Sequence, residues 1–374
     1  MKGKRLFAFL GLLAIAVSGV ARDGATATVY AQESVTTACQ WEEDTVSVGD
    51  FTVRSRLLEL LLENEDEEVA AGEERMLIPW GGVFGARIKS DHPTVRQAED
   101  GCGVKNGDRI THAYGIEIER VCELDELIRS QGCQRIPLTV IRQEREVEVT
   151  VSLKPTDNGY TLPFELQEGA AGIGTVTYID PESMTFGGLG HGICDPDTGG
   201  VINMKAGTVC GVILGGVQKG ESGKPGELCG ILNDRQLGSL YANTEVGVFG
   251  RLNAIPKNRI SAIPAGKPSD VKVGEAKVIS TVKNGMTEEY SIEITSVNLD
   301  ATGSKCFRIK VTDPTLLALT GGVVRGMSGS PIIQNGKLIG AVTHVMVADP
   351  TEGYGIFIQN MLEASQQGTL PKAA

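Results

Sequence analysis

One turn in the sequence has the residue types that a nucleophilic serine needs. The motif GMSGSP at 326–331 places Ser328 between two glycines, ahead of an apolar run. Because glycine lacks a Cβ, the chain can turn sharply there and expose the serine hydroxyl. The backbone N–H groups of Gly326 and Ser328 could then stabilise a developing oxyanion. We take Ser328 as the nucleophile, with Ser330 of the same turn as the alternative.

A nucleophilic serine needs a general base, and the sequence contains only four histidines. His92 and His112 fall in a small unit in the first half of the chain, where we expect surface or loop positions. His191 has glycine on both sides, which leaves room for its ring to turn and for a substrate to approach. His344 lies on a predicted strand, where a lone histidine is usually structural. We therefore predict that His191 is the base and keep His344 as the alternative.

The carboxylate that would orient the imidazole has three candidates. Asp313 precedes a proline shortly before the serine turn, and Asp195 and Asp197 follow His191. Asp–Pro steps are common in turns, so each candidate also has an ordinary structural explanation. The local pattern leaves the choice open. Chemistry by a serine and a histidine needs no metal or organic cofactor.

The composition indicates a mainly β chain that does not bind nucleic acid. The 374 residues include 48 glycines but only 5% aromatics, which favours tight turns and close strand contacts over long helices. The net charge of −12 argues against a nucleic-acid partner, because phosphate binding needs clustered Lys and Arg. The eight cysteines are scattered without a C-x-x-C pair, so we expect no zinc site; their spacing leaves disulfides open.

The N-terminus has the pattern of an export signal. A basic stretch at 1–5 precedes an apolar run at 6–21, and small-residue cleavage sites occur at 19–21 and 29–31. The apolar run is shorter than the about 20 residues of a membrane span. We expect residues 1–31 to be a signal peptide or a retained N-terminal anchor, with the rest of the chain outside the cytoplasmic membrane.

Three further parts follow the signal. Residues 32–75 are predicted to be a linker that contains a short leucine-rich helix and an acidic run. Residues 76–155 are predicted to form a compact unit of strands, tight turns and one helix. Residues 156–374 alternate short apolar runs with Gly, Pro, Asp and Asn turns, which indicates an all-β barrel. The predicted strands of this last part include 173–179, 209–214, 276–282, 307–311 and 338–347, and a terminal helix is predicted at 357–364.

The unit at 76–155 has a recognisable order of elements. Turns at 106–108 and 114–115 precede a predicted helix at 123–129 and two hairpin strands at 136–141 and 147–153. This order resembles a PDZ domain. The resemblance implies a loop whose backbone N–H groups bind the terminal carboxylate of a peptide. By position, that loop consists of Gly81, Gly82, Val83, Phe84 and Gly85; a purely structural turn is the alternative.

Several stretches of the second half share a pattern with one peptidase family. They are AAGIGT at 170–175, GHGI at 190–193, KPGE at 224–227, TDP at 312–314 and GGVVRGMSGSP at 321–331. Together they resemble the stage IV sporulation protein B (SpoIVB) family of serine peptidases. The resemblance implies that His191, Asp313 and Ser328 are the catalytic residues. It also implies a mainly β fold, in which a PDZ-like domain is followed by a chymotrypsin-like β-barrel serine peptidase domain at 156–374.

The same resemblance implies a role in sporulation. Members of this family are secreted into the space between the forespore and mother-cell membranes. There they cleave themselves and a membrane-bound regulator of an intramembrane metalloprotease that matures a sigma factor. Two alternatives differ in class: a catalytically silent secreted PDZ adaptor, and a serine protease of general envelope quality control.

Overall fold

The computed structural model describes residues 75–157, 159–255, 261–283 and 285–367, together with the backbone of four short strands nearer the N-terminus. The linker helix and acidic run predicted within 32–75 lie outside the described residues, as does most of the predicted signal at 1–31. Within the described ranges, no helix is long and apolar enough to cross a membrane. The four strands are β1 (Phe7–Leu10), β2 (Ala16–Val20), β3 (Ala27–Tyr30) and β4 (Ala38–Trp41).

Six strands between residues 83 and 252 pair into a closed ring. Starting from β6, the neighbours are β13, β14, β17, β16 and β15, and β15 pairs again with β6. All pairs are antiparallel, and the inward-facing apolar side chains of these strands form one core. The strands of this first barrel are β6 (Val83–Arg96), β13 (Glu165–Ile179), β14 (Thr185–Gly188), β15 (Met204–Gln218), β16 (Glu227–Thr244) and β17 (Gly247–Leu252).

A second closed barrel follows in the chain, with the strand order β19, β20, β21, β24, β23, β22. It has its own apolar core, and two helices lie outside the ring, one between β21 and β22 and one after β24. The elements are β19 (Gly274–Lys283), β20 (Met286–Val297), β21 (Phe307–Val311), α3 (Pro314–Thr320), β22 (Pro331–Gln334), β23 (Lys337–Val345), β24 (Glu352–Phe357) and α4 (Ile358–Gln367). The prediction of a mainly β fold with a barrel is confirmed.

The two barrels have the same strand order. If the strands of each barrel are numbered one to six along the chain, both rings read 1-2-3-6-5-4. The sequence shows no repeat at a fixed period, because equivalent strands differ in length and in the loops that join them. Short β5 (Met76–Pro79), β18 (Ile263–Pro264) and the 3₁₀ helix η1 (Pro268–Asp270) lie in the connections.

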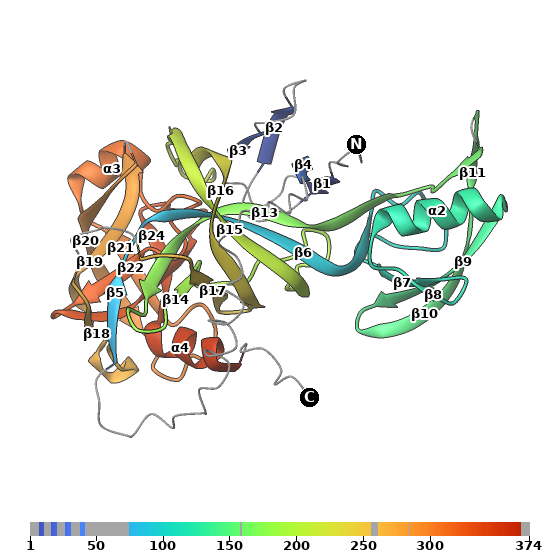
Figure 1. The fold of residues 1–374 in the computed structure, drawn as a ribbon. Helices are drawn as coiled ribbons and strands as arrows, with labels where there is room; N and C mark the ends of the chain where they lie inside the picture. The colour runs from blue at the N-terminus through green and yellow to red at the C-terminus, as the bar shows by residue number, and fades with distance from the viewer. Residues whose placement is uncertain are drawn as a thin grey trace, which may run out of the picture.

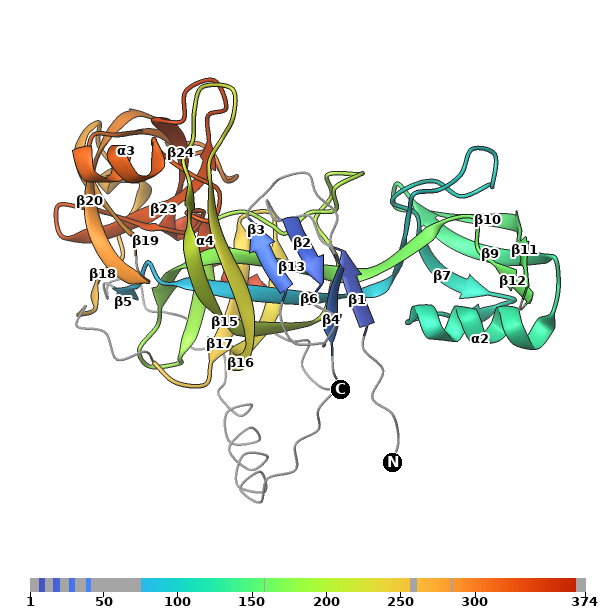
Figure 2. The ribbon, with the colours of Figure 1, turned by 90° about the horizontal axis from the view of Figure 1, so that it is seen from above.

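A small unit is inserted between the first two strands of the first barrel, after β6 and before β13. Its core is separate and includes Leu124 and Ile128 of its helix. Figures 1 and 2 show this unit at one end of the molecule, with the first barrel between it and the second barrel. Its elements are β7 (Arg109–Ala113), β8 (Ile116–Glu117), α2 (Val121–Gln131), β9 (Arg135–Arg142), β10 (Arg145–Ser152), β11 (Lys154–Thr156) and β12 (Gly159–Thr161).

Local sequence determines these elements of the inserted unit. The helix ends where Gly132 adopts a left-handed conformation, with φ of 59°. Gln143 and Glu144 both have positive φ, which lets a two-residue turn join β9 and β10. The predicted helix, the two predicted turns and the predicted hairpin are therefore present where the sequence placed them.

The predicted boundary of this unit differs from the observed one. The sequence predicts a PDZ-like domain that includes residues 76–96, but β6 pairs along most of its length with β13 and β15 of the first barrel. The loop at 81–85 consequently lies between the barrels: the carbonyl of Gly81 accepts a hydrogen bond of 2.9 Å from Thr281 Oγ1 of the second barrel. Gly85 packs against Leu232 and Cys210 inside the first barrel. The five residues Gly81, Gly82, Val83, Phe84 and Gly85 therefore form barrel structure and do not line a groove of the inserted unit.

We expect the two barrels to fold without the inserted unit. Arg96 and Glu165 are direct register partners, so a short turn can join β6 to β13. Replacing residues 98–163 by a four-residue Gly-Ser turn should leave a soluble protein that unfolds in one cooperative thermal transition, because the core of the inserted unit is separate. Thermal unfolding of the shortened and the full-length protein, followed by circular dichroism, measures whether the transition is cooperative. An aggregated or non-cooperative product would show that the barrels depend on the insertion.

Candidate active site

The Ser328 turn of the second barrel is held by β13 of the first barrel. Thr175 and Thr177, both fully buried, donate hydroxyl hydrogen bonds of 2.8 Å to the carbonyls of Gly326 and Gly329. The N–H of Thr175 also donates to the carbonyl of Ser328 at 3.0 Å. Gly329 has φ of 94°, and a Cβ on it would lie 2.0 Å from the Thr175 carbonyl oxygen. The glycine is therefore required for the turn to approach β13 this closely.

The two serines of the turn have different surroundings. Ser330 is fully buried, and its hydroxyl donates to Ser280 Oγ at 3.0 Å. Ser328 is partly exposed, and its hydroxyl donates to the carbonyl of Thr343 on β23 at 2.7 Å. Only Ser328 can reach a substrate, so the structure excludes Ser330 as the nucleophile.

Two backbone donors of the turn remain available for an oxyanion. Within the described ranges, neither the N–H of Gly326 nor that of Ser328 donates a hydrogen bond, whereas the N–H of Gly329 donates to Val342 at 2.7 Å. A backbone N–H without a partner is uncommon in a folded protein. The two free donors are the pair that the sequence indicated for an oxyanion hole.

The tip of the β15–β16 hairpin fixes the peptide that carries the Gly326 N–H. The N–H of Arg325 donates to Gly226 at 2.8 Å, and the carbonyl of Arg325 accepts from Leu228 at 2.9 Å. In a trans peptide the C=O and the following N–H point in opposite directions, so the Gly326 N–H is directed away from the hairpin. The KPGE stretch at 224–227 thus has a structural role that its residue types did not reveal.

Two histidines lie beside the serine turn. His191 follows β14 of the first barrel and His344 lies on β23 of the second, with their ring centroids 5.1 Å apart. Gly190 packs closely against Thr343, whose carbonyl accepts the Ser328 hydroxyl. The structure therefore gathers the loop of His191, the strand of His344 and Ser328 at the junction of the two barrels.

The His191 ring is held in the tautomer that a general base needs. Its Nδ1 lies 2.9 Å from the carbonyl oxygen of Gly192. Because a carbonyl only accepts, Nδ1 must donate, and in the neutral ring Nε2 then carries no hydrogen and is the nitrogen that can accept a proton. This contact sets the tautomer, a task that a carboxylate performs in a Ser-His-Asp triad.

His344 is a poor candidate for the base. Burial lowers its pKa to about 3, with a smaller contribution from the positive charges of His191 and Lys305. Its Nδ1 is buried and has no hydrogen-bond partner in the part of the chain that the structure describes. A ring that stays neutral to such low pH accepts a proton too weakly to activate a hydroxyl. The geometry favours His191.

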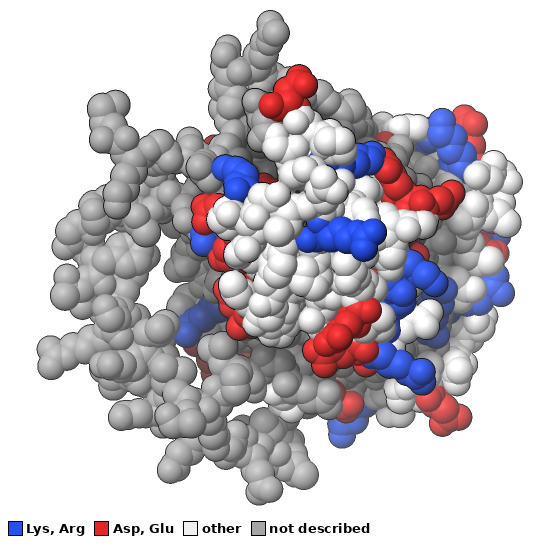
Figure 3. All heavy atoms as spheres, turned by 90° about the vertical axis from the view of Figure 1, so that its right-hand side faces the viewer, with Lys and Arg blue, Asp and Glu red and all other residues white. Residues whose placement is uncertain are grey.

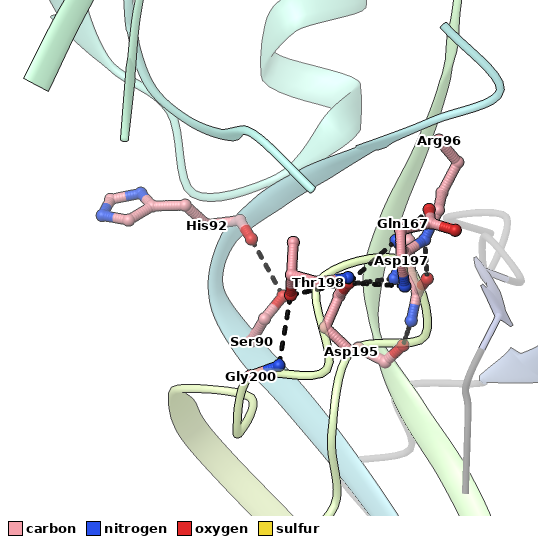
Figure 4. Close-up of polar contacts among 9 residues, drawn as sticks. Ser90, His92, Arg96, Gln167, Asp195, Asp197, Thr198 and Gly200 are labelled. Atoms are coloured by element: carbon pink, nitrogen blue, oxygen red, sulfur yellow. Dashed lines mark hydrogen bonds and ion pairs between the residues drawn. The ribbon is translucent and has the colours of Figure 1, made fainter. Parts of the chain in front are cut away.

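The three candidate carboxylates have other partners. Asp313 caps α3, accepting from the N–H groups of Thr315 at 2.8 Å and Leu316 at 3.0 Å, and it also accepts from Ser291 N at 3.3 Å. Asp195 and Asp197 bind the guanidinium of Arg96 (Figure 4). The structure thus places the loop of His191 against the strand whose Thr343 carbonyl accepts the Ser328 hydroxyl, and it places Asp313 at a helix terminus.

Two barrels with the same strand order, a histidine loop in the first and a serine turn in the second are the arrangement of chymotrypsin-like serine peptidases. A family model described as SpoIVB peptidase S55 matches residues 158–362. This match covers more than half of the 374 residues, and the chain belongs to the SpoIVB peptidase S55 family. No curated protein matches the sequence.

Solved structures of two kinds are similar at low identity. The HtrA-type protease AlgW with a decapeptide is 11% identical with a TM-score of 0.34, over 77% of this chain and 64% of that one. The inactive form of the Rv3671c protease, from M. tuberculosis H37Rv, is 14% identical with a TM-score of 0.30, over 53% of this chain and 85% of that one. The present chain thus spans just under two thirds of the AlgW structure, and the family assignment depends on the family model alone.

The lowered pKa of His344 predicts a dependence of stability on pH. Between pH 6.5 and about 3 the unfolded ring is protonated and the folded ring is not, so folding loses stability as the pH falls. From pH 7 to pH 5 this loss amounts to about 2 kcal/mol. Urea unfolding at both pH values should show that the free energy of unfolding falls less between pH 7 and pH 5 in His344→Gln than in the wild type, by about this amount. Equal losses in the two proteins would contradict the buried neutral ring.

Proposed function

We propose that this chain is an exported serine endopeptidase in which Ser328 attacks the scissile carbonyl. His191 Nε2 takes the hydroxyl proton and returns it to the leaving amine, and the N–H groups of Gly326 and Ser328 stabilise the oxyanion. The observation that carries the proposal is the pair of free N–H donors beside a partly exposed serine, next to a histidine of the required tautomer. Asp313 acts indirectly in this proposal, since it caps the helix that precedes the turn.

One rearrangement is needed before attack. The Ser328 hydroxyl donates to the Thr343 carbonyl in this structure, so it must rotate toward His191 when a substrate binds. Catalytic hydrogen bonds often tighten only in the complex with substrate. The serine therefore rests in a hydrogen-bonded orientation until the site is occupied.

The substrate and setting are proposed from family membership and from the N-terminal sequence. The basic and apolar stretches at 1–21 support export, and the family supports a role in sporulation. We place the protein between the forespore and mother-cell membranes, released or anchored by its N-terminus. Its substrates would be its own N-terminal region and a membrane-bound regulator of an intramembrane metalloprotease.

The inserted unit is the proposed site of partner recognition. Its order of turns, helix and hairpin supports a PDZ-like peptide-binding role. On the face seen in Figure 3, acidic and basic side chains are interspersed with uncharged ones, without a continuous basic patch. Such a face suits a protein segment better than a nucleic acid.

Labelling with a fluorophosphonate tests the nucleophile. The wild type should be labelled covalently, and Ser328→Ala should lose all labelling because the attacking oxygen is gone. Ser330→Ala is the matched control, since it removes a buried hydroxyl from the same turn and should keep the reaction. Intact-mass measurement reports the adduct. A folded wild type that takes no label would instead favour a binding-only adaptor.

Self-cleavage predicts a difference at the N-terminus. Wild-type protein recovered from expressing cells should have more than one first residue, because cleavage removes part or all of residues 1–75. In Ser328→Ala the starting positions should reduce to that left by signal processing, or to the intact chain. N-terminal sequencing distinguishes these outcomes, and identical termini in the two proteins would contradict self-cleavage.

A further inference from the structure

A buried arginine connects the inserted unit to the loop that carries His191. Arg96 is the last residue of β6, where the chain leaves the first barrel, and its side chain is only 2% exposed. Its Nε donates to Gln167 on β13 at 2.6 Å, next to the point where the chain returns. Its two terminal nitrogens bind Asp195 and Asp197 (Figure 4). All three guanidinium nitrogens are therefore used.

The acidic partners belong to a tight turn that closes the His191 loop. Asp195 Oδ1 accepts from the N–H groups of Asp197 and Thr198, both at 3.0 Å, and from the Thr198 hydroxyl at 3.1 Å. Burial alone would raise the pKa of Asp195, but the hydrogen bonds and charge of Arg96 outweigh it and lower that pKa. The turn is therefore organised around an ionised carboxylate that Arg96 holds.

Hydrogen bonds continue from this turn back to the histidine. The N–H of Asp195 donates to Gly200 at 2.7 Å, and Ile202 N donates to Ile193 at 2.9 Å. The side chain of Asn243 bonds to both the N–H and the carbonyl of Ile193, two residues after His191. A displacement of the turn is consequently transmitted to the backbone that positions the imidazole.

The inserted unit touches the same turn directly. Gly107, in its first tight turn, faces Thr198: a Cβ on Gly107 would lie 2.2 Å from Thr198 Cγ2. The N–H of Gly107 donates to Val95 at 2.9 Å, one residue before Arg96. The Arg96 ion pairs and the Gly107 contact thus meet at one turn, 195–199.

We propose that Arg96 is a positioning residue for His191, and that the contact of Gly107 with Thr198 makes the activity of the histidine depend on the placement of the inserted unit. The inference rests on the proposed peptidase function. Neither residue touches substrate; both act through the turn at 195–199. A peptide or protein that shifts the inserted unit would then change the rate of the chemical step.

The test compares two pairs of variants in the full-length protein. Gly107→Ala adds a methyl group against Thr198, whereas Gly115→Ala adds one at a second positive-φ turn of the inserted unit, where nothing lies within 4 Å. Arg96→Lys keeps the charge but loses the bidentate geometry. Arg75→Lys is its control, because Arg75 pairs with Asp180, a residue outside the His191 loop.

For Gly107→Ala and Arg96→Lys, we expect kcat on a peptide substrate to fall about 10- to 100-fold with KM changed less than about twofold, as for a misplaced catalytic group. Hydrogen exchange at residues 189–200 should be faster in both, and Gly115→Ala and Arg75→Lys should match the wild type. If Arg96→Lys fails to fold, the comparison of Gly107→Ala with Gly115→Ala decides the question by itself.

The outcomes separate this inference from the proposed function. A wild type that cleaves and reacts with fluorophosphonate, with Gly107→Ala as active as Gly115→Ala, would overturn the inference alone. Loss of kcat without faster exchange at 189–200 would also overturn it, because the effect would not pass through the loop. A folded but unreactive wild type would overturn the proposed function and the inference together.

Discussion

The active site depends on the hydrogen bonds that two buried threonines of one barrel make to the serine turn of the other. Thr175 and Thr177 bind the carbonyls on either side of Ser328, and both side chains are fully excluded from solvent. A buried hydroxyl or carbonyl that loses its partner costs about 1–3 kcal/mol. The barrels can therefore dock closely in only one relative position, and that position brings the His191 loop to the nucleophile.

Each functional part of the site receives support from the barrel that does not contain it. The hairpin tip of the first barrel orients the Gly326 N–H through its bonds to Arg325. The Thr343 strand of the second barrel packs against Gly190, next to the histidine. The site is thus a product of docking, and a substitution at the interface can abolish activity while each barrel remains folded.

The sequence predicted those parts of the structure that local patterns determine. The glycine-flanked serine, the helix of the inserted unit and its hairpin occur where propensity and turn residues predict them, although the hairpin turn is shorter than predicted. The prediction for the loop at 81–85 is wrong because its glycines suggest a turn, whereas its place in the fold is set by the pairing of β6 with β13, about 90 residues away. Residue patterns within a short window contain no information on such a pairing.

Asp313 shows that local sequence also leaves the contacts of a single side chain undecided. Asp followed by Pro and an apolar run is a common start of a helix, and the structure shows this aspartate capping α3. The family resemblance implied a triad member here, but the oxygens of Asp313 accept hydrogen bonds from the backbone of its own helix and from Ser291.

The insertion has a mechanical consequence that a domain added at a chain end would lack. The unit is joined to the first barrel by β6 and β13. These two strands stay paired from the barrel to the point where the inserted unit begins, at Arg96 and Glu165. Arg96 and Gln167 lie on these two strands and bind each other, and Arg96 also binds Asp195 and Asp197 of the turn after His191. In the proposed coupling, movement of the inserted unit would therefore strain these ion pairs. A domain on a single flexible tether would move without this effect, so the proposed coupling of the inserted unit to the active site depends on the double connection.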